Sequence, residues 1–72
     1  MEFDFSKLKG QIVEKFGTRT AFAEKWGKTD RYLSDRLNNK IMMDTVDIHE
    51  MCELLDINCV DIPVYFFTPK VR

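Results

Sequence analysis

The stretch that decides the fold is residues 18–40, TRTAFAEKWGKTDRYLSDRLNNK. Thr18 is a good N-cap for a helix, and Gly27 tolerates the positive φ angle that commonly ends one. Thr29 can cap a second helix, which has an apolar stripe on one side and charged side chains on the other. The stretch therefore predicts two short helices joined by a tight turn.

The spacing within this stretch is that of a helix-turn-helix over about residues 18–38, in which two helices cross steeply. Ala23 is small where the helices approach each other, and Gly27, four residues later, allows the turn. Leu33 lies six residues beyond the glycine and fills the space between the helices, while Phe22 anchors the first helix to the core. In DNA-reading proteins of this kind, the second helix enters the major groove.

Helical periodicity continues on both sides of the motif. An apolar stripe before it predicts a first helix that begins after Asp4 and ends at Gly17. The clearest helical spacing in the chain comes after the motif and predicts a helix that starts near Asp44 or Thr45. The stripes consist of Phe5, Leu8, Ile12 and Phe16 in the first helix, and of Ile48, Met51, Cys52 and Leu55 in the later one.

The last part of the chain gives a mixed pattern. Asn58 can cap a short turn, and Pro63 discourages a long continuous helix. Residues 64–67, VYFF, form an apolar run that fits either one helical turn or a short strand. We therefore expect one all-α domain over residues 1–72, a compact lambda-repressor-like unit of four to five helices with an undecided C-terminal tail.

Charge is segregated along the chain. Residues 1–40 hold nine Lys or Arg and six Asp or Glu, a net charge of +3. Residues 41–72 hold two basic and six acidic residues, a net charge of −4, and the two halves sum to the total of −1. The near-neutral total does not exclude a nucleic-acid partner, because the motif lies in the basic half.

Several other classes of function lack support in the sequence. No apolar run approaches the roughly 18 residues of a membrane span. Cys52 and Cys59 do not have zinc-motif spacing, and His49 is the sole histidine. We expect two buried free thiols, no metal or other cofactor, and no enzymatic activity, because no catalytic constellation is visible.

The motif resembles the helix-turn-helix of phage repressors and Cro proteins, within the xenobiotic-response-element-type class. That family shows a Leu/Phe-Ala pair, then Gly, Ser/Thr and Ile/Leu-Ser. The matching residues are Phe22-Ala23, Gly27, Thr29 and Leu33-Ser34. The whole chain also looks like short phage Cro-like proteins in its segments FDFSKLKG, IVEKFGT, LSDRLNNK and IPVYFF. Lys28 and Arg36 stand where the family often has apolar residues, and both are expected to add positive charge near the DNA face.

The resemblance implies a sequence-specific DNA-binding transcriptional regulator. Arg31 and Asp35 fall on the side of their helix opposite Leu33. Arg31 can donate a bidentate pair to guanine, whereas Asp35 can accept from cytosine or orient Arg31. The predicted base contacts are Arg31, Tyr32, Asp35 and Asp30. The predicted phosphate contacts are Thr18, Arg19, Thr20, Lys28, Thr29, Ser34, Asn38, Asn39 and Lys40.

The expected partner is double-stranded operator DNA, bound by a homodimer in the cytoplasm of a bacterial host, at the nucleoid. A dimer suits half-sites that lie about 34 Å apart. Its predicted surface is the run Val64, Tyr65, Phe66 and Phe67, although this run could equally fold back onto the core. The alternative function is a protein-binding adaptor or anti-regulator with the same fold, which would use the acidic half of the chain as its interface.

Overall fold

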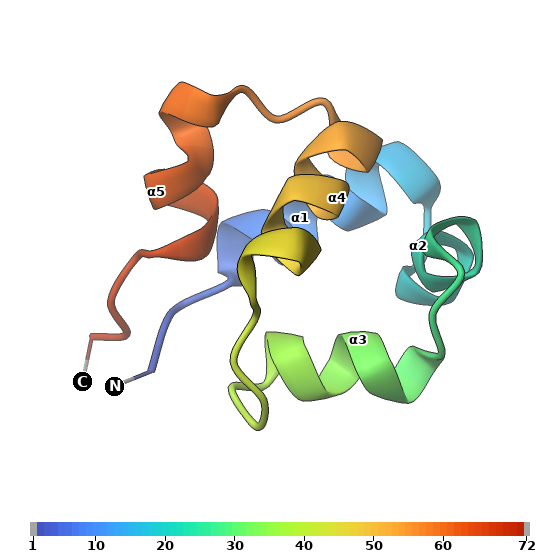
Figure 1. Cartoon of the computed structure of the whole chain (residues 1–72), viewed down its shortest axis with the longest axis horizontal. Coiled ribbons are helices and arrows are strands. Elements are labelled where there is room, and N and C mark those ends of the chain that lie inside the picture. The colour runs from blue at the N-terminus through green and yellow to red at the C-terminus, as the bar shows by residue number, and fades with distance from the viewer. Residues whose placement is uncertain (1, 72) are drawn as a thin grey trace.

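The computed structural model describes residues 2–71 and confirms the all-α prediction (Figure 1). Its elements are α1 (Ser6–Phe16), α2 (Arg19–Trp26), α3 (Asp30–Leu37), α4 (Thr45–Leu55), the 3-10 turn η1 (Cys59–Asp61) and α5 (Ile62–Phe66). Within residues 2–71, β-pairing is limited to one isolated bridge between Phe3 and Pro69. None of the helices in this range is long and apolar enough to cross a lipid bilayer.

The predicted caps of α2 and α3 are confirmed. The Thr18 hydroxyl accepts the N–H of Ala21 at 3.0 Å, and the Thr29 hydroxyl accepts the N–H of Tyr32 at 3.0 Å. Gly27 ends α2 with a φ of 80°, in the left-handed region that glycine enters without steric cost. The local chemistry of residues 18–29 therefore fixes where both helices begin and where the chain turns.

Helix α4 begins with a capping box. The Asp44 side chain accepts the N–H of Asp47 at 2.7 Å, and the Asp47 side chain accepts the N–H of Asp44 at 3.3 Å. Helix α1 begins slightly differently from the prediction, because Phe5 occupies its N-cap position. Asp4 still serves this helix end, since its carboxylate accepts the N–H of Ser6 at 2.8 Å.

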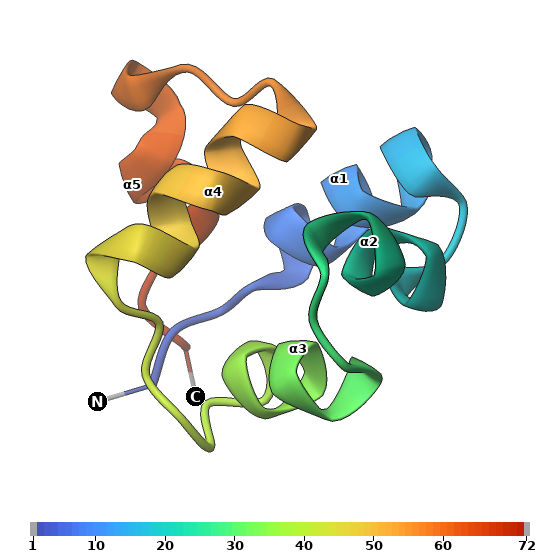
Figure 2. The same cartoon turned by 45° about the vertical axis from the view of Figure 1, so that its right-hand side comes forward.

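The core lies where all five helices meet. Helix α1 contacts α2, α4 and α5, and α2 also packs on α3 and α4. Figure 2 shows α4 and α5 together on one side of α1, with α2 on the other side and α3 below. The largest fully buried side chains are Leu8, Ile12, Phe22, Leu33, Leu37, Met51, Leu55 and Phe66.

The C-terminal run is helical and partly folded back, which resolves the two questions left by its sequence. Phe66 is buried in the core and Tyr65 is half-buried, whereas Val64 and Phe67 are 45% and 46% exposed. The expectation of two buried thiols is wrong for Cys59, which is exposed, and right for Cys52. Trp26 is half-buried and donates its ring N–H to Glu50 at 2.9 Å.

The two ends of the described chain form a clasp beside the end of α3. The N–H of Asp4 donates to the carbonyl of Thr68 at 2.7 Å. The Asn39 amide exchanges two hydrogen bonds with the backbone of Phe3, at 3.0 and 2.9 Å. Asn39 itself has a φ of 62°, so these bonds hold a left-handed turn in place after α3.

Two glycine substitutions should change stability in opposite directions. Gly10 lies within α1, and a Cβ built there meets nothing within 4 Å, as is also true at Gly27. Gly10→Ala should raise the free energy of unfolding by about 0.5–1 kcal/mol, because the unfolded chain loses freedom. Gly27→Ala should lower it by about 1–2 kcal/mol, because alanine is strained at positive φ. Urea unfolding measures both, and equal effects would contradict the assigned turn.

Candidate nucleic-acid interface

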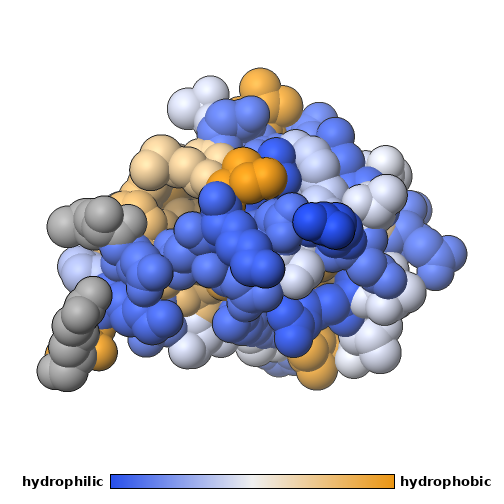
Figure 3. All heavy atoms as spheres, turned by 90° about the horizontal axis from the view of Figure 1, so that it is seen from below, coloured by the Kyte–Doolittle hydropathy of each residue, from blue (hydrophilic) through white to orange (hydrophobic). Residues whose placement is uncertain are grey.

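Helix α3 is held by its inner side and presents its outer side to solvent. Leu33 and Leu37 are buried against the core, while α2 packs across them. Figure 3 views the molecule from below, the side on which α3 lies in Figure 1, and this face is mostly hydrophilic. Apolar atoms gather toward the left of that view, the side on which α5 lies in Figure 1. The outer side of α3 is therefore a polar, accessible surface.

Arg31 lies exposed on the outer side of α3, as predicted, whereas Asp35, which was predicted to face outward with it, is mostly covered. The Arg31 side chain is 88% exposed and the Asp35 side chain 19% exposed, and the Arg31 Nε and Asp35 Oδ2 atoms are 3.7 Å apart. An ion pair of this length with one fully hydrated partner is worth about 0.3–0.5 kcal/mol. Arg31 can therefore leave Asp35 for a ligand at little cost.

Asp30 lies at the first turn of α3 and faces the start of α2. The Thr20 hydroxyl donates to its carboxylate at 3.5 Å, and both side chains are exposed. A carboxylate at this position is also stabilised by the α3 dipole. Asp30 thus stands at the accessible N-terminal end of the helix, beside Arg31.

Tyr32 lies on the inner side of α3, away from Arg31. Its hydroxyl donates to Asp47 Oδ1 of α4 at 2.6 Å, and its ring forms a T-shaped contact with that of Trp26, with centroids 5.4 Å apart. The Arg36 guanidinium covers the same ring at 3.4 Å from the centroid. A base contact by Tyr32, which the sequence predicted, would have to give up this hydrogen bond, so the structure assigns Tyr32 to the α3–α4 junction instead.

The expectation that Arg36 adds positive charge to the outer face is wrong. Arg36 Nε donates to Asp47 Oδ2 at 3.1 Å, and the two side chains are only 13% and 3% exposed. Arg36 also donates to the carbonyl of Tyr32 at 3.2 Å. The charge of Arg36 is therefore balanced inside the domain, between α3 and α4.

Asp47 is the residue that sequence reasoning missed. Burial alone would raise the pKa of this carboxyl, but hydrogen bonds from Tyr32 and Arg36 and from the backbone outweigh that effect and lower its pKa below 3.8. The available signal was an arginine at a position that is often apolar in the resembled family, together with an acid three residues into a capped helix. Neither feature says that the two side chains meet.

Lys28 lies over aromatic rings at the turn between α2 and α3. Its ammonium is 4.8 Å from the centroid of Tyr32 and 5.8 Å from that of Trp26. The side chain is half-buried, and cation–π attraction of about 0.5–1 kcal/mol holds it there. Its positive charge lies just before the N-terminal end of α3, and a phosphate contact by Lys28 stays a prediction.

A polar hollow brings five predicted DNA-contacting residues together. Its wall is formed by Arg19, Thr20, Asp30, Ser34 and Asn38. Leu33 and Lys9 of α1 complete the wall, and Lys9 is outside the predicted set of contacts. Two cations against one acid leave the hollow net positive, as a phosphate site requires.

Three other predicted phosphate contacts already have structural hydrogen bonds. The hydroxyls of Thr18 and Thr29 cap α2 and α3, and the Asn39 amide holds the backbone of Phe3. Lys40 is exposed just beyond the end of α3. The accessible predicted contacts are therefore the residues of the hollow, Arg31, and Lys28 and Lys40 at the two ends of α3.

The Tyr32 hydroxyl should contribute strongly to stability. Tyr32→Phe leaves one oxygen of a buried carboxylate without its donor, which should lower the free energy of unfolding by about 1.5–3 kcal/mol. Tyr65→Phe is the matched control, because the Tyr65 hydroxyl forms no hydrogen bond with any of residues 2–71. Urea unfolding should show a change within about 0.5 kcal/mol for this control. Equal losses in the two variants would contradict the assigned bond.

The same carboxylate should make stability depend on pH. A depressed pKa in the folded state contributes stability that is complete above the ordinary value of 3.8 and is lost as the pH falls through the folded value. The difference in unfolding free energy between the native chain and Tyr32→Phe should therefore be constant near neutral pH and shrink in acid. Urea titrations between about pH 6 and about pH 2.5 test this. A difference that grows in acid would show that Asp47 is not the carboxylate involved.

The similarity of the chain to known proteins agrees with this architecture. No curated protein matches the sequence significantly. The solution structure of the modulator of repression (MOR) of the temperate bacteriophage TP901-1 from Lactococcus lactis is 40% identical in sequence, with a TM-score of 0.84. The match covers 100% of this chain and 97% of that one. Residues 1–69 match the family described as "Protein of unknown function (DUF739)". These similarities support the phage-regulator part of the predicted resemblance, without specifying a Cro or CI protein. The chain therefore belongs to the DUF739 family and to the same family as this small phage regulatory protein.

Proposed function

We propose that this protein regulates phage transcription by binding operator DNA through the outer side of α3 and the polar hollow beside it. The observation that carries the proposal is Arg31, which is 88% exposed and only loosely paired on the outer side of a capped α3. Its guanidinium can read guanine in the major groove, where α3 is narrow enough to enter. The family relationship to a modulator of repression supports a role in phage gene control.

Each part of this surface has a distinct role in the proposal. Arg31 reads a base, and Asp35 either accepts from cytosine or orients Arg31. Arg19 and Lys9 approach phosphates from the hollow, and Lys40 does so from the end of α3. The exposed side of the motif is thereby divided between base readout in the middle and phosphate contacts at its edges.

A homodimer remains part of the proposal, because one recognition helix reads too few base pairs for an operator. Residues 64–67, the predicted dimer surface, expose less apolar area for such a contact than their sequence suggested. Phe66 is buried in its own core, so Val64 and Phe67 provide the accessible apolar surface. Such a dimer would therefore use a small contact at α5.

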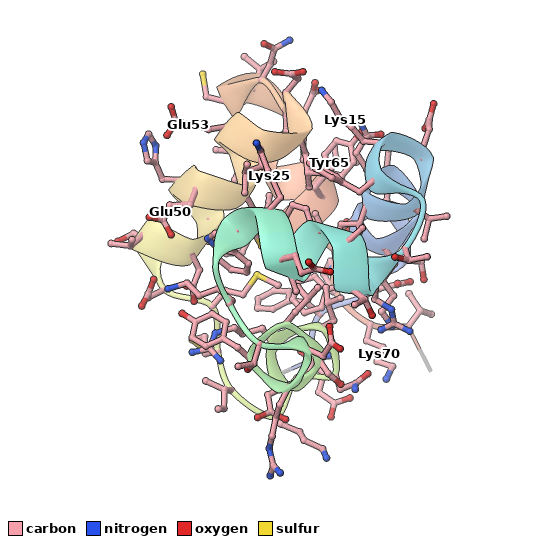
Figure 4. All side chains as sticks on the ribbon, turned by 90° about the vertical axis from the view of Figure 1, so that its right-hand side faces the viewer. Lys15, Lys25, Glu50, Glu53, Tyr65 and Lys70 are labelled. Carbon is pink, nitrogen blue, oxygen red and sulfur yellow. The ribbon has the colours of Figure 1, made fainter. Side chains whose placement is uncertain are left out.

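The proposal is tested by comparing Arg31→Ala with a control variant, Lys25→Ala. Lys25 projects from the side of α2 that faces away from α3 (Figure 4), and it is exposed. Duplexes are first selected from a random pool with the native protein, and affinities are then measured by fluorescence anisotropy. Arg31→Ala should cost about 1–3 kcal/mol on the selected duplex and relax its sequence preference. Lys25→Ala should change the affinity by less than about twofold.

Two results would count against DNA binding. One is a pool that shows no enrichment at low salt. The other is an equal loss in both variants, which would indicate diffuse electrostatic attraction in place of base readout.

A second candidate is a protein-binding regulator, and one observation favours it. The acidic half of the chain exposes large apolar side chains, among them Met42 at 79% and Val60 at 78%. A relative called a modulator of repression is compatible with action on a regulatory protein as well as on DNA. This candidate uses a different face of the molecule from the one that contains Arg31.

A further inference from the structure

An apolar groove runs between α4 and the segment that contains η1 and α5. Ile48 and Cys52 of α4 form one wall, and Ile57, Ile62 and Phe67 form the other. The groove opens to solvent, and Phe67 is 46% exposed. Apolar surface that is concave and accessible is the usual setting for an inserted apolar side chain.

The groove continues past the start of α4 into a second hollow. Thr45, Ile48 and Phe67 line both hollows, and Met42 and Phe3 extend the second one. The apolar surface is thus longer than one pocket. Met42 is a flexible side chain that adapts to different partners.

The charges around this surface are negative. Glu53 lines the first hollow and Asp44 the second, and none of the Lys or Arg side chains of residues 2–71 lines either one. His49 is paired with Glu53 at 3.1 Å. Figure 4 shows Glu53 projecting from α4. A ligand that brings positive charge to the rim is therefore favoured.

The same charges disfavour a second copy as the occupant. A two-fold dimer that filled this groove would set the acidic half, with its net charge of −4, against itself, so the small dimer contact proposed at α5 would centre on Val64, which lines neither hollow. An added strand is disfavoured too, because residues 2–71 contain one isolated bridge and no sheet edge. An amphipathic helix meets both requirements, because its apolar stripe can fill the groove and basic residues beside the stripe can face the acidic rim.

We propose that the groove between α4 and α5 binds an amphipathic helix of a partner protein, with apolar side chains in the groove and Lys or Arg residues at its rim. The inference rests on the protein-binding candidate and is independent of DNA binding by α3. The wall formed by Ile48 and Cys52 receives the apolar stripe, and Glu53 and Asp44 pair with its basic flanks. The recognition mode is that of a helix in a groove.

Cys59 provides a probe of occupancy in the native chain. Cys59 lines the groove and is exposed, whereas Cys52 is buried, so a maleimide reagent reacts first at Cys59. The test ligand is a synthetic Leu/Lys amphipathic helix of about five turns, labelled for fluorescence anisotropy. A peptide with every Lys replaced by Glu keeps the apolar stripe and reverses the charge. The Lys peptide should bind and slow the labelling of Cys59, and the Glu peptide should do neither.

Thr45→Arg tests the location of the site. Thr45 is an exposed residue that lines both hollows, so an arginine there fills the groove and repels a basic ligand. Val46→Arg is the control, because Val46 is the next residue of α4, is exposed, receives the same charge, and lines neither hollow. Thr45→Arg should weaken binding of the Lys peptide by about tenfold or more, and Val46→Arg by less than about threefold. Circular dichroism and thermal midpoints establish that both variants remain folded.

Several outcomes would overturn the inference. Equal loss in the two arginine variants, or binding that leaves Cys59 labelling unchanged, would mean attraction to the acidic half without use of the groove. Equal binding of the Glu peptide would remove the charge argument. Protection of Cys59 that rises with protein concentration alone would make a second copy the occupant. Thr45→Arg should leave affinity for the selected duplex unchanged, so failure here is distinct from failure of DNA binding.

Discussion

The ion pair between Arg36 and Asp47 is the constraint on which the position of α3 depends. Helix α3 has eight residues and places only Leu33 and Leu37 in the core. Its remaining anchor is polar, because Arg36 and Tyr32 both bind the buried carboxylate of Asp47 on α4. A buried charge that loses one partner is strongly destabilising. The arrangement therefore ties the orientation of α3 to α4.

The fold was largely predictable because its signals are local. Thr18, Gly27 and Thr29 act on backbone groups within three or four residues, and such chemistry is visible in the sequence. Apolar spacing likewise located α1 and α4. The helical state of residues 64–67 was not predictable, because so short a run satisfies both periodicities. Burial of Phe66 in the core, where α5 packs on α1, is a tertiary effect and selects the helix.

The candidate site was predictable only where it depends on one helix. The angular position of Arg31 relative to Leu33 follows from α-helical geometry, and Arg31 is exposed as expected. The directions in which the Tyr32 and Arg36 side chains point depend instead on the side chains of the helix that lies beside α3. Their partner, Asp47, lies 15 and 11 residues away on another helix, so no local rule could place it. Asn39 was misleading for the same reason, because its amide binds the backbone 36 residues away.

The clasp between the chain ends has a consequence for the order of folding. Asn39 can complete its two bonds to Phe3 only after the segment before α1 has returned to the end of α3, and Asp4 must also meet Thr68. Closing loops of this length carries a larger entropic cost than forming a cap. The last turn of α3 and the residues up to Lys40 should therefore become ordered late.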